Sequence, residues 1–465
     1  MVSATETAAA REAPPEGPRL GLATATFVVV SSMIGTGVLT TSGFTVYFVG
    51  SNQLMLALWV VGGVLALCGA LTLCELSAAL PRSGGDYVFL SEAYGPLAAF
   101  LSGWVSFLIG FGGPIAASAS AAAKYLLGPL RLGDASAAVA QPAVASAAIV
   151  ALGVVHCLGR GSTIRAQAGM TALKIGILAA LAVAVLAAGW GRWENLADRP
   201  PLTSGLLITM ASSLVYISYA YTGWNAASYL AGEVDRPQER MPRAILLGTG
   251  LVLALYLALN TAYALALSAA DVRAIVGGSE DVNAIAPIAQ IAAERLYGPR
   301  VAAPMSMAIG LTLLASVSAY ILTGPRVAYA MARAGQFPEV AGRLSSQGAP
   351  AIATALQVAW SLALLWTASF ERILLYSGVG LAIFSMLTVS AVYVLRWRQP
   401  DLLRPFRTPG YPIVPAVYLG GTGRLTAAVF YERPVVSSLS LLSIAIGVPV
   451  YYVRASAAWR RCNAP

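Results

Sequence analysis

The sequence predicts an all-α integral membrane protein with about twelve transmembrane helices. Of its 465 residues, 58% are hydrophobic and only 11% are charged, whereas an ordinary soluble domain has roughly 25% charged residues. Long apolar runs also recur along the whole chain, and a helix that crosses a bilayer needs about 20 apolar residues. A water-soluble surface cannot be built from this composition, so we expect lipid to surround the protein.

Apolar windows between charged residues or Pro and Gly breaks define the expected spans. They cover residues 21–46, 53–80, 97–123, 142–158, 166–189, 205–230, 244–268, 301–331, 350–369, 373–395, 412–430 and 435–453. Tails at residues 1–20 and 454–465 flank these spans. The first tail lacks the charged start, apolar core and cleavage site of a secretory signal, so the first helix is expected to remain as an anchor.

The charges indicate orientation rather than a charged partner. The formal net charge is +9, which in a soluble protein would suggest nucleic acid. With the N-terminus in the cytoplasm, however, the inner loops hold about twice as many basic residues as the outer loops. We therefore expect a multi-pass plasma-membrane protein, in a bacterium the inner membrane, with both termini cytoplasmic and no nucleic-acid partner.

Two regions are harder to assign. The eleventh span is interrupted by three glycines and Arg424, and an arginine at that depth either snorkels to the surface or marks a helix end. The polar segment at residues 269–300 is expected to be a solvated loop with one amphipathic helix at Ala284–Leu296.

The first span contains a pattern that a lipid-facing helix does not favour. The segment Ser31–Gly37 places two glycines and three hydroxyl residues in mid-membrane. Each glycine costs about 1 kcal/mol relative to alanine in a helix, and unpaired backbone is tolerated at this depth only where it lines a cavity or ligand. The alternative is close packing of helices through small residues, which we expect for Gly62 and Gly63.

The sixth span contains a second interruption, at Ser218–Asn225, with aromatic and polar residues that are unusual at membrane depth. The interval between the two interruptions predicts an inverted repeat of five helices in which the first helix of each half is broken at the bilayer midplane. The two repeats would cover residues 21–189 and 205–395, and residues 412–453 would add two further helices.

Two broken helices that meet at the midplane can bind the two opposite charges of a zwitterion. The N-terminus of a half-helix offers free N–H groups and a positive dipole end to a carboxylate. The exposed carbonyls at the C-terminus of the other half-helix suit an ammonium group. Together they predict a socket for the α-amino and α-carboxyl groups of an amino acid.

Several segments together resemble the amino acid–polyamine–organocation (APC) transporters. They are Met33–Gly37, Pro81–Tyr87 with Glu92–Gly95, Tyr221–Asn225 with Glu233–Gln238, Arg326–Arg333, and Phe406–Pro412. Each motif is weak alone, but their order and spacing extend from about Gly21 to Val453. The Gly-Trp-Asn triplet in the sixth span leans toward the L-type amino acid transporters and their bacterial relatives. The resemblance implies a LeuT-like 5+5 inverted repeat with helices 1 and 6 broken.

The resemblance also implies roles for individual residues. The N–H groups of Thr36 and Gly37 would hold the substrate carboxylate, and the carbonyls of Met33 and Tyr219 would take the ammonium. The ring of Tyr219 would act as the gate above the substrate. Asn225 lies where proton-sensing exchangers of the family can carry glutamate, which counts against acid gating through this position. The full expected substrate-binding set is Met33, Ile34, Gly35, Thr36, Gly37, Tyr219, Ala220, Thr222, Gly223 and Asn225.

Lys174 is the one lysine inside an expected span, because the only other lysine is Lys124. Its insertion in hydrocarbon costs at least about 2.5–3.5 kcal/mol, so it needs a partner or a cavity unless it snorkels. In the resembled family an ammonium here replaces a sodium ion near the first half-helix, with contacts to Gly35 and neighbouring carbonyls and to hydroxyls such as Ser316 or Ser318. It would then act as a proton carrier or as a fixed cation, and either role predicts sodium-independent transport.

The function predicted from these features is secondary active transport of amino acids by alternating access, through proton symport or exchange. Neutral L-amino acids are favoured because no charge besides Lys174 is expected near the pocket; a cationic amino acid or polyamine carrier is the alternative. A channel would need a filter or rings of charge. No catalytic motif indicates an enzyme.

Neither a cofactor nor a metal is expected, because the four cysteines lack CxxC spacing. Some L-type relatives bind a single-span partner through a cysteine between the third and fourth helices. Residues 124–141 contain no cysteine, so a disulfide-linked partner subunit is not expected.

Overall fold

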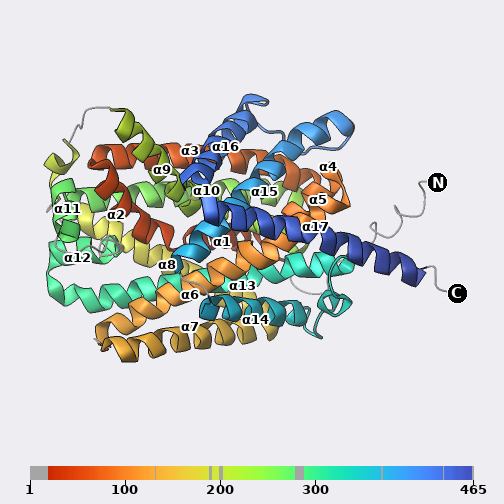
Figure 1. Cartoon of the computed structure of the whole chain (residues 1–465), viewed down its shortest axis with the longest axis horizontal. Helices are drawn as coiled ribbons and strands as arrows, with labels where there is room; N and C mark the ends of the chain where they lie inside the picture. The colour runs from red at the N-terminus through yellow and green to blue at the C-terminus, as the bar shows by residue number, and fades with distance from the viewer. Residues whose placement is uncertain are drawn as a thin grey trace.

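A computed structural model describes residues 19–130, 132–187, 191–197, 203–277, 287–367, 370–432 and 434–462. Over these residues the regular secondary structure is helical, apart from one isolated parallel β-bridge between Leu20 and Val234. The long helices run side by side along the longest dimension of the molecule (Figure 1). The chain is therefore an all-α bundle, as the composition predicts.

The first half of the bundle contains eight α-helices and two short helices of other types. These are α1 (Leu22–Met33), α2 (Gly37–Val49), α3 (Asn52–Ala79), α4 (Asp86–Tyr94), α5 (Pro96–Val105), η1 (Ser106–Phe111), α6 (Gly112–Leu127), η2 (Gly128–Leu130), α7 (Asp134–Cys157) and α8 (Arg160–Ala187). The pairs α1 with α2 and α5 with α6 each occupy one expected span, the second through the π-helix η1.

The second half begins with a short connection and a broken helix. Its elements are η3 (Trp193–Leu196), α9 (Ser204–Ala220), η4 (Ala226–Glu233), α10 (Pro237–Ala266), α11 (Ala269–Gly277), α12 (Ile288–Tyr297), η6 (Pro299–Val301), α13 (Ala302–Arg333), η7 (Glu339–Gly342), α14 (Ala351–Thr367), α15 (Phe370–Arg398), α16 (Ile413–Glu432) and α17 (Pro434–Cys462).

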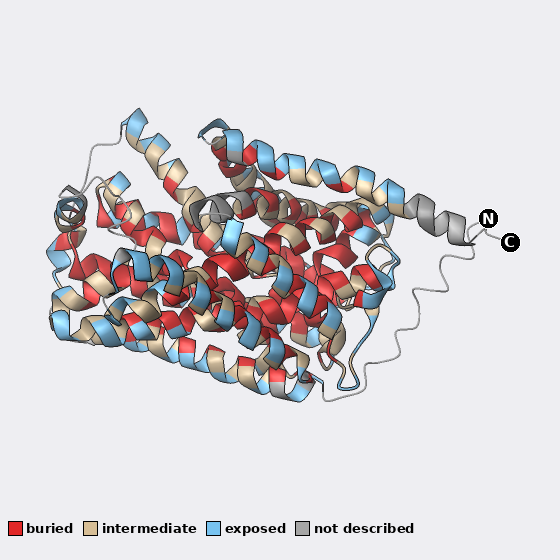
Figure 2. Cartoon of the chain, turned by 60° about the horizontal axis from the view of Figure 1, so that its bottom comes forward, coloured by how far each residue is buried: buried red, intermediate tan, exposed pale blue. Residues whose placement is uncertain are grey.

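The expected spans are confirmed at the level of helices. Among the described residues, ten segments are long and apolar enough to cross a membrane, and the shorter apolar helices α9 and α14 occupy the sixth and ninth expected positions. Large apolar side chains on the outer helices are exposed, such as Val183, Ile208 and Leu442. Buried residues lie inside the bundle (Figure 2), so this apolar exterior is the surface expected to face lipid. The division into two five-helix repeats stays a prediction.

Three local expectations differ from the structure. The sixth span is not an α-helix to residue 230, because α9 ends at Ala220 and a 3₁₀-helix follows a turn. Arg424 does not end a helix, since α16 continues through it and the side chain is exposed. The amphipathic helix expected at 284–296 is α12, which begins at Ile288, and residue 284 lies outside the described residues.

The two helix breaks pack against each other through glycine. A Cβ built on Gly37 would lie 2.4 Å from the Cβ of Ala220, and one built on Gly223 would lie 2.7 Å from the carbonyl oxygen of Ser32. Gly223 also has a φ of +103°, which side chains rarely adopt. Glycine at these positions allows the two unwound segments to approach within backbone contact.

A buried carboxylate joins α3 to the C-terminal part of the bundle. Glu75 of α3 accepts hydrogen bonds from Arg396 of α15, at 2.9 and 2.7 Å, and from the backbone N–H of Thr408 at 2.7 Å. Arg404 lies 3.4 Å from the same carboxylate. These contacts tie α3 to α15 and to the loop that follows it.

We predict that Gly223→Ala destabilises the protein by at least about 1–3 kcal/mol, because the new Cβ meets Ser32 in a strained conformation. Gly176→Ala is the matched control, since a Cβ added to that helical glycine would have no heavy atom within 4 Å. Thermal unfolding of both purified variants in detergent measures the difference. Equal unfolding temperatures would show that the breaks do not need this close contact.

Candidate functional site

The first expected break is present between α1 and α2. The helix ends at Met33, Ile34 has an extended ψ of 92°, and the next helix begins at Gly37. In the described backbone hydrogen bonds, neither the Thr36 nor the Gly37 N–H is a donor. These N–H groups belong to the start of a half-helix, where four donors lack a partner in the preceding turn. They are the donors that the sequence analysis expects to hold a substrate carboxylate.

The second break lies at the end of α9, where five residues from Tyr221 to Asn225 form a turn before η4. The turn is held locally, since the N–H and the hydroxyl of Thr222 both donate to the Tyr219 carbonyl, at 3.0 and 2.7 Å. Gly223 follows in this turn with a φ of +103°. The expected interruption at Ser218–Asn225 is therefore real and begins a few residues later than its first polar residue.

Both breaks line one internal cavity of about 80 Å³. A water needs about 10–15 Å³ on the same scale, so the cavity admits several waters or a small organic molecule. Its wall comes from α1, α2, η1, α6, α9, η4, α13, α15 and α16, together with Asp86 at the start of α4. The lining includes Ser32, Met33, Gly35, Thr36, Gly37, Asp86, Ser106, Phe111, Ser118, Tyr219, Ala220, Thr222, Gly223, Asn225, Tyr229, Tyr320, Phe384, Ser385 and Tyr418.

The structure brings the expected substrate-binding residues to this cavity, with Ile34 as the exception. Ile34 is not among the lining residues, and its side chain is buried at 1% exposure. Its carbonyl accepts hydrogen bonds from Lys174 and Ser316 instead. Ile34 therefore belongs to the support behind the break, because the extended turn points its carbonyl away from the cavity.

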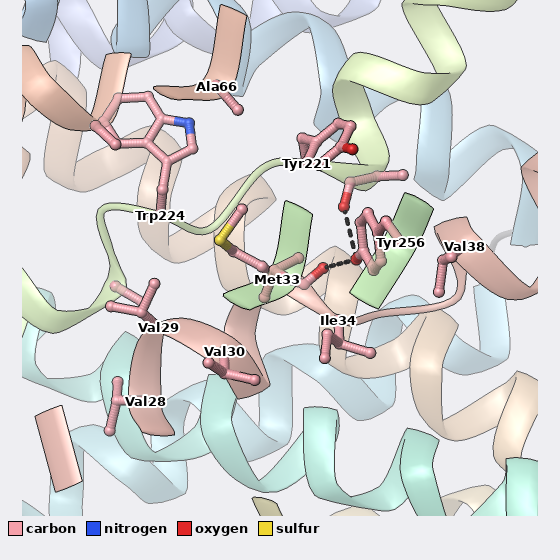
Figure 3. Close-up of a cluster of buried hydrophobic side chains, with 14 of the residues drawn as sticks. Val28, Val29, Val30, Met33, Ile34, Val38, Ala66, Tyr221, Trp224 and Tyr256 are labelled. Atoms are coloured by element: carbon pink, nitrogen blue, oxygen red, sulfur yellow. Dashed lines mark hydrogen bonds between the residues drawn. The ribbon is translucent and has the colours of Figure 1, made fainter. Parts of the chain in front are cut away.

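The two carbonyls expected to bind an ammonium already accept hydrogen bonds from other groups of the protein. The Met33 carbonyl accepts from the Tyr256 hydroxyl at 2.8 Å and from the Gly35 N–H at 3.0 Å, as Figure 3 shows for the tyrosine. The Tyr219 carbonyl accepts two hydrogen bonds from Thr222, one from its N–H and one from its hydroxyl. A carbonyl has two lone pairs, so a substrate ammonium at either position has to share or replace one of these bonds.

Tyr219 lies between two spaces. It lines the central cavity and also a second cavity of about 90 Å³, whose wall comes mainly from α3, α9, α15 and α16. A Cβ on Gly378 of α15 would lie 3.4 Å from the Tyr219 ring. An aromatic ring between two cavities, beside a glycine, can change rotamer without a large backbone shift, which suits the predicted gate.

Lys174 lies behind the first break and is fully buried, with 1% of its side chain exposed. Its Nζ donates to the carbonyl of Ser31 at 3.1 Å, to the carbonyl of Ile34, and to the hydroxyl of Ser316 at 2.7 Å. The Ser316 hydroxyl in turn donates to the Ile34 carbonyl at 2.7 Å. The ammonium therefore supplies donors to the carbonyls that α1 leaves unpaired at its end, and it does not snorkel.

Two details of the expected lysine site are wrong. The carbonyls that Lys174 contacts are those of Ser31 and Ile34 rather than Gly35. Ser318 is not a partner of Lys174 in the described hydrogen bonds: its hydroxyl donates to Gln167 at 2.6 Å and contacts His156 at 2.9 Å. Residues two apart on a helix point in different directions, so Ser316 faces the lysine, whereas Ser318 faces Gln167 of α8 and His156 of α7.

Sequence reasoning missed the carboxylate in the cavity wall. Asp86 lines the cavity, so the expectation that no charged group besides Lys174 lies near the pocket is wrong. Asn225 Nδ2 donates to Asp86 at 2.8 Å and the Tyr229 hydroxyl donates at 3.0 Å. The signal was the Ser83–Tyr87 segment, whose glycines allow the tight turn that directs α4 toward η4. Other lining residues, such as Phe111, Tyr320 and Tyr418, come from helices whose sequences lack a distinguishing pattern.

A membrane bundle whose two broken helices face one central cavity defines a class of carrier proteins that bind small polar molecules at the midplane. Comparison with known proteins gives the family. The family model "Amino acid permease" matches residues 20–452, and the chain belongs to that family.

Curated relatives align along nearly the whole chain. The rat "Large neutral amino acids transporter small subunit 2" is 29% identical, covering 93% of this chain and 80% of the relative. The human "Cystine/glutamate transporter" is 25% identical, covering 92% and 83%. The mouse "Asc-type amino acid transporter 1" is 27% identical, covering 93% and 80%. These are transporters of the L-type branch, which the sequence motifs favoured.

We predict that Lys174→Met lowers transport by at least tenfold, because methionine fills the space but removes the ammonium donor from the Ser31 carbonyl and leaves the Ile34 carbonyl with Ser316 alone. An unsatisfied buried group costs about 1–3 kcal/mol. Lys124→Met, which alters the exposed second lysine, is the matched control and should behave like the wild type. Uptake into liposomes measures the effect. Equal uptake by both variants would refute a role for the buried ammonium.

Proposed function

We propose that this protein carries neutral L-amino acids across the membrane by alternating access. The observation that supports this most directly is the single cavity lined by both helix breaks, with the unpaired N–H groups of Thr36 and Gly37 at one side. A substrate carboxylate binds to those donors and to the positive end of α2. Its ammonium shares the Met33 and Tyr219 carbonyls, and the Tyr219 ring closes over it.

The cavity is suited to a small or medium apolar side chain. Ala220, Thr222 and Gly223 occupy little space on one wall, while Phe111 and Phe384 give apolar surface on others. The three named relatives are transporters of large neutral amino acids, of cystine and glutamate, and of the Asc type, so the side-chain class differs within the branch. One observation favours the cationic alternative: Asp86 in the cavity wall could pair with a positive side chain.

Sodium is not required in this proposal. Lys174 places a positive charge against the carbonyls at the end of α1 and against the Ser316 hydroxyl, which are the oxygen ligands that a small cation would otherwise use. A second cation beside the ammonium would meet strong repulsion in a region of low dielectric constant. Lys174 therefore acts as a built-in substitute for the ion.

We further propose that the carrier works without a disulfide-linked subunit in the bacterial inner membrane, with both termini cytoplasmic. The names of some relatives include "small subunit", which indicates a heteromeric assembly for those proteins. In this chain the segment between α6 and α7 contains no cysteine. Recovery of an equimolar disulfide-linked subunit from native membranes would refute the proposal.

Counterflow in liposomes tests the substrate class. We expect vesicles loaded with unlabelled amino acid to take up labelled L-alanine, L-leucine or L-phenylalanine, whereas L-arginine and L-glutamate give at most a tenth of that rate. Fast exchange of L-arginine would select the cationic alternative. Currents of single channels, or uptake that does not saturate, would contradict a carrier.

The same vesicles test independence from sodium. Replacing sodium with choline in the external buffer is expected to change the uptake rate by less than twofold, because Lys174 occupies the cation position. A loss of uptake in choline would mean that the ammonium does not replace sodium. Vesicles without protein provide the background.

A further inference from the structure

Asp86 is a buried acid in the wall of the central cavity that the proposed binding mode leaves unused. It is the first residue of α4, its side chain is 6% exposed, and it lines the same space as Thr36 and Tyr219. A buried charge is costly unless another charge or several hydrogen bonds compensate it. The partners of Asp86 therefore determine whether the charged or the neutral form of its carboxyl group is the more stable one.

The partners of Asp86 are neutral. Its Oδ2 accepts the hydrogen bonds from Asn225 and Tyr229, while its Oδ1 is buried and has no hydrogen-bond partner within the described part of the chain. Two other acids whose side chains are largely shielded from solvent are paired with arginine: Glu75 with Arg396, and Glu233 with Arg326 at 2.9 Å. Among the described ion pairs, none includes Asp86.

The groups that face Asp86 from the neighbouring elements carry no charge at neutral pH. They are Asn225 and Tyr229 from the sixth span, Thr388 from α15 and Tyr418 from α16. Burial raises the pKa of Asp86 to about 6, and contacts with Tyr229, Asn225 and Thr388 lower it only in part. The carboxyl group is thus protonated increasingly as the pH falls through about 6, and no charged neighbour fixes its state.

The carboxyl group is connected to the turn that breaks the sixth span and to η4, which both form part of the cavity wall. Asn225 is the last residue of the turn that breaks the sixth span and itself lines the cavity. The ring of Tyr229 packs edge to face on Phe111, another lining residue, with 5.4 Å between centroids. A change of charge on Asp86 therefore alters hydrogen bonds made by η4 and its preceding turn. Opening the cavity to water stabilises the charged form, whereas closing it stabilises the neutral form.

We propose that Asp86 is a proton-binding site in the wall of the substrate cavity, and that one proton moves with each amino acid. The carboxylate takes the proton from water on the side from which the substrate enters. It releases the proton to water on the other side once the cavity opens there. Asp86 ends each cycle unchanged, so the two aqueous phases are the source and the sink. This proposal depends on the carrier function proposed above.

The test uses liposomes with pH 7.5 inside and pH 6 outside, and the neutral amino acid that gives the fastest counterflow. With one proton per substrate, a gradient of 1.5 pH units supports accumulation up to about 30-fold, since each unit corresponds to 1.36 kcal/mol. We expect wild-type protein to accumulate substrate several-fold above equilibrium. Asp86→Asn, which has the same shape but carries no titratable group, is expected to lower that accumulation to the level without a gradient, with the accumulation of each protein compared at its own counterflow rate.

Glu92→Gln is the matched control. It makes the same change of carboxylate to amide on the same helix, but Glu92 is partly exposed and pairs with Arg82. We expect Glu92→Gln to accumulate substrate like the wild type. If Asp86→Asn also accumulates like the wild type, the proposal is wrong, and a shift in its ranking of amino acids would show instead that Asp86 binds the substrate side chain.

A measurement on the wild type keeps the proposal testable if Asp86→Asn does not fold. A pH-sensitive dye inside the vesicles is expected to report acidification that requires the amino acid. Counterflow without any substrate-dependent acidification would overturn the proton site and leave the carrier function intact. Absence of counterflow for every amino acid in the panel would instead refute the carrier function itself.

Discussion

The structure depends on how unpaired backbone is satisfied in mid-membrane. Water is absent at that depth, so a broken helix is stable only if other groups replace its lost hydrogen bonds. At the end of α1 these replacements come from side chains on three other helices: Lys174, Ser316, Tyr256 and Tyr320, which donates to the Ser32 carbonyl at 2.9 Å. The start of α2 is left without such partners. This asymmetry makes one side of the break a fixed support, whereas the other side keeps backbone donors that face the cavity.

The same constraint explains the distribution of charges. Lys174 is held by three oxygen atoms, Glu75 and Glu233 are held by arginines, and each holds one helix to another. Asp86 is held only by an amide and a phenol that belong to the second break. The three groups with strong partners stabilise the scaffold, whereas the group with weak partners can change its charge. The scaffold groups and the titratable group are thus all ionisable side chains, and they differ in the neighbours that hold them.

Residue type and order predicted most of the fold, because apolar length is nearly decisive in a membrane. The twelve spans and both breaks could be found from hydropathy, glycine pairs and polar residues at depth. The end of α9 at Ala220 and the 3₁₀ form of η4 could not be found from these local patterns. Both are associated with the packing of Gly223 on the backbone of Ser32, which is a contact between distant parts of the chain. Arg424 looked like an interruption, yet its place on the outer face of α16 lets the helix continue.

The sequence alone therefore determined that this is a membrane protein, which segments cross the bilayer, where two helices break, and that Lys174 needs a partner. These properties are local, because they depend on runs of residues and on the cost of placing each one in lipid. The tertiary structure decided which carbonyls Lys174 contacts, that Ile34 and Ser318 face away from the expected positions, and that Asp86 reaches the cavity. Those outcomes depend on helix rotation and on contacts between residues more than a hundred positions apart, which no local pattern specifies.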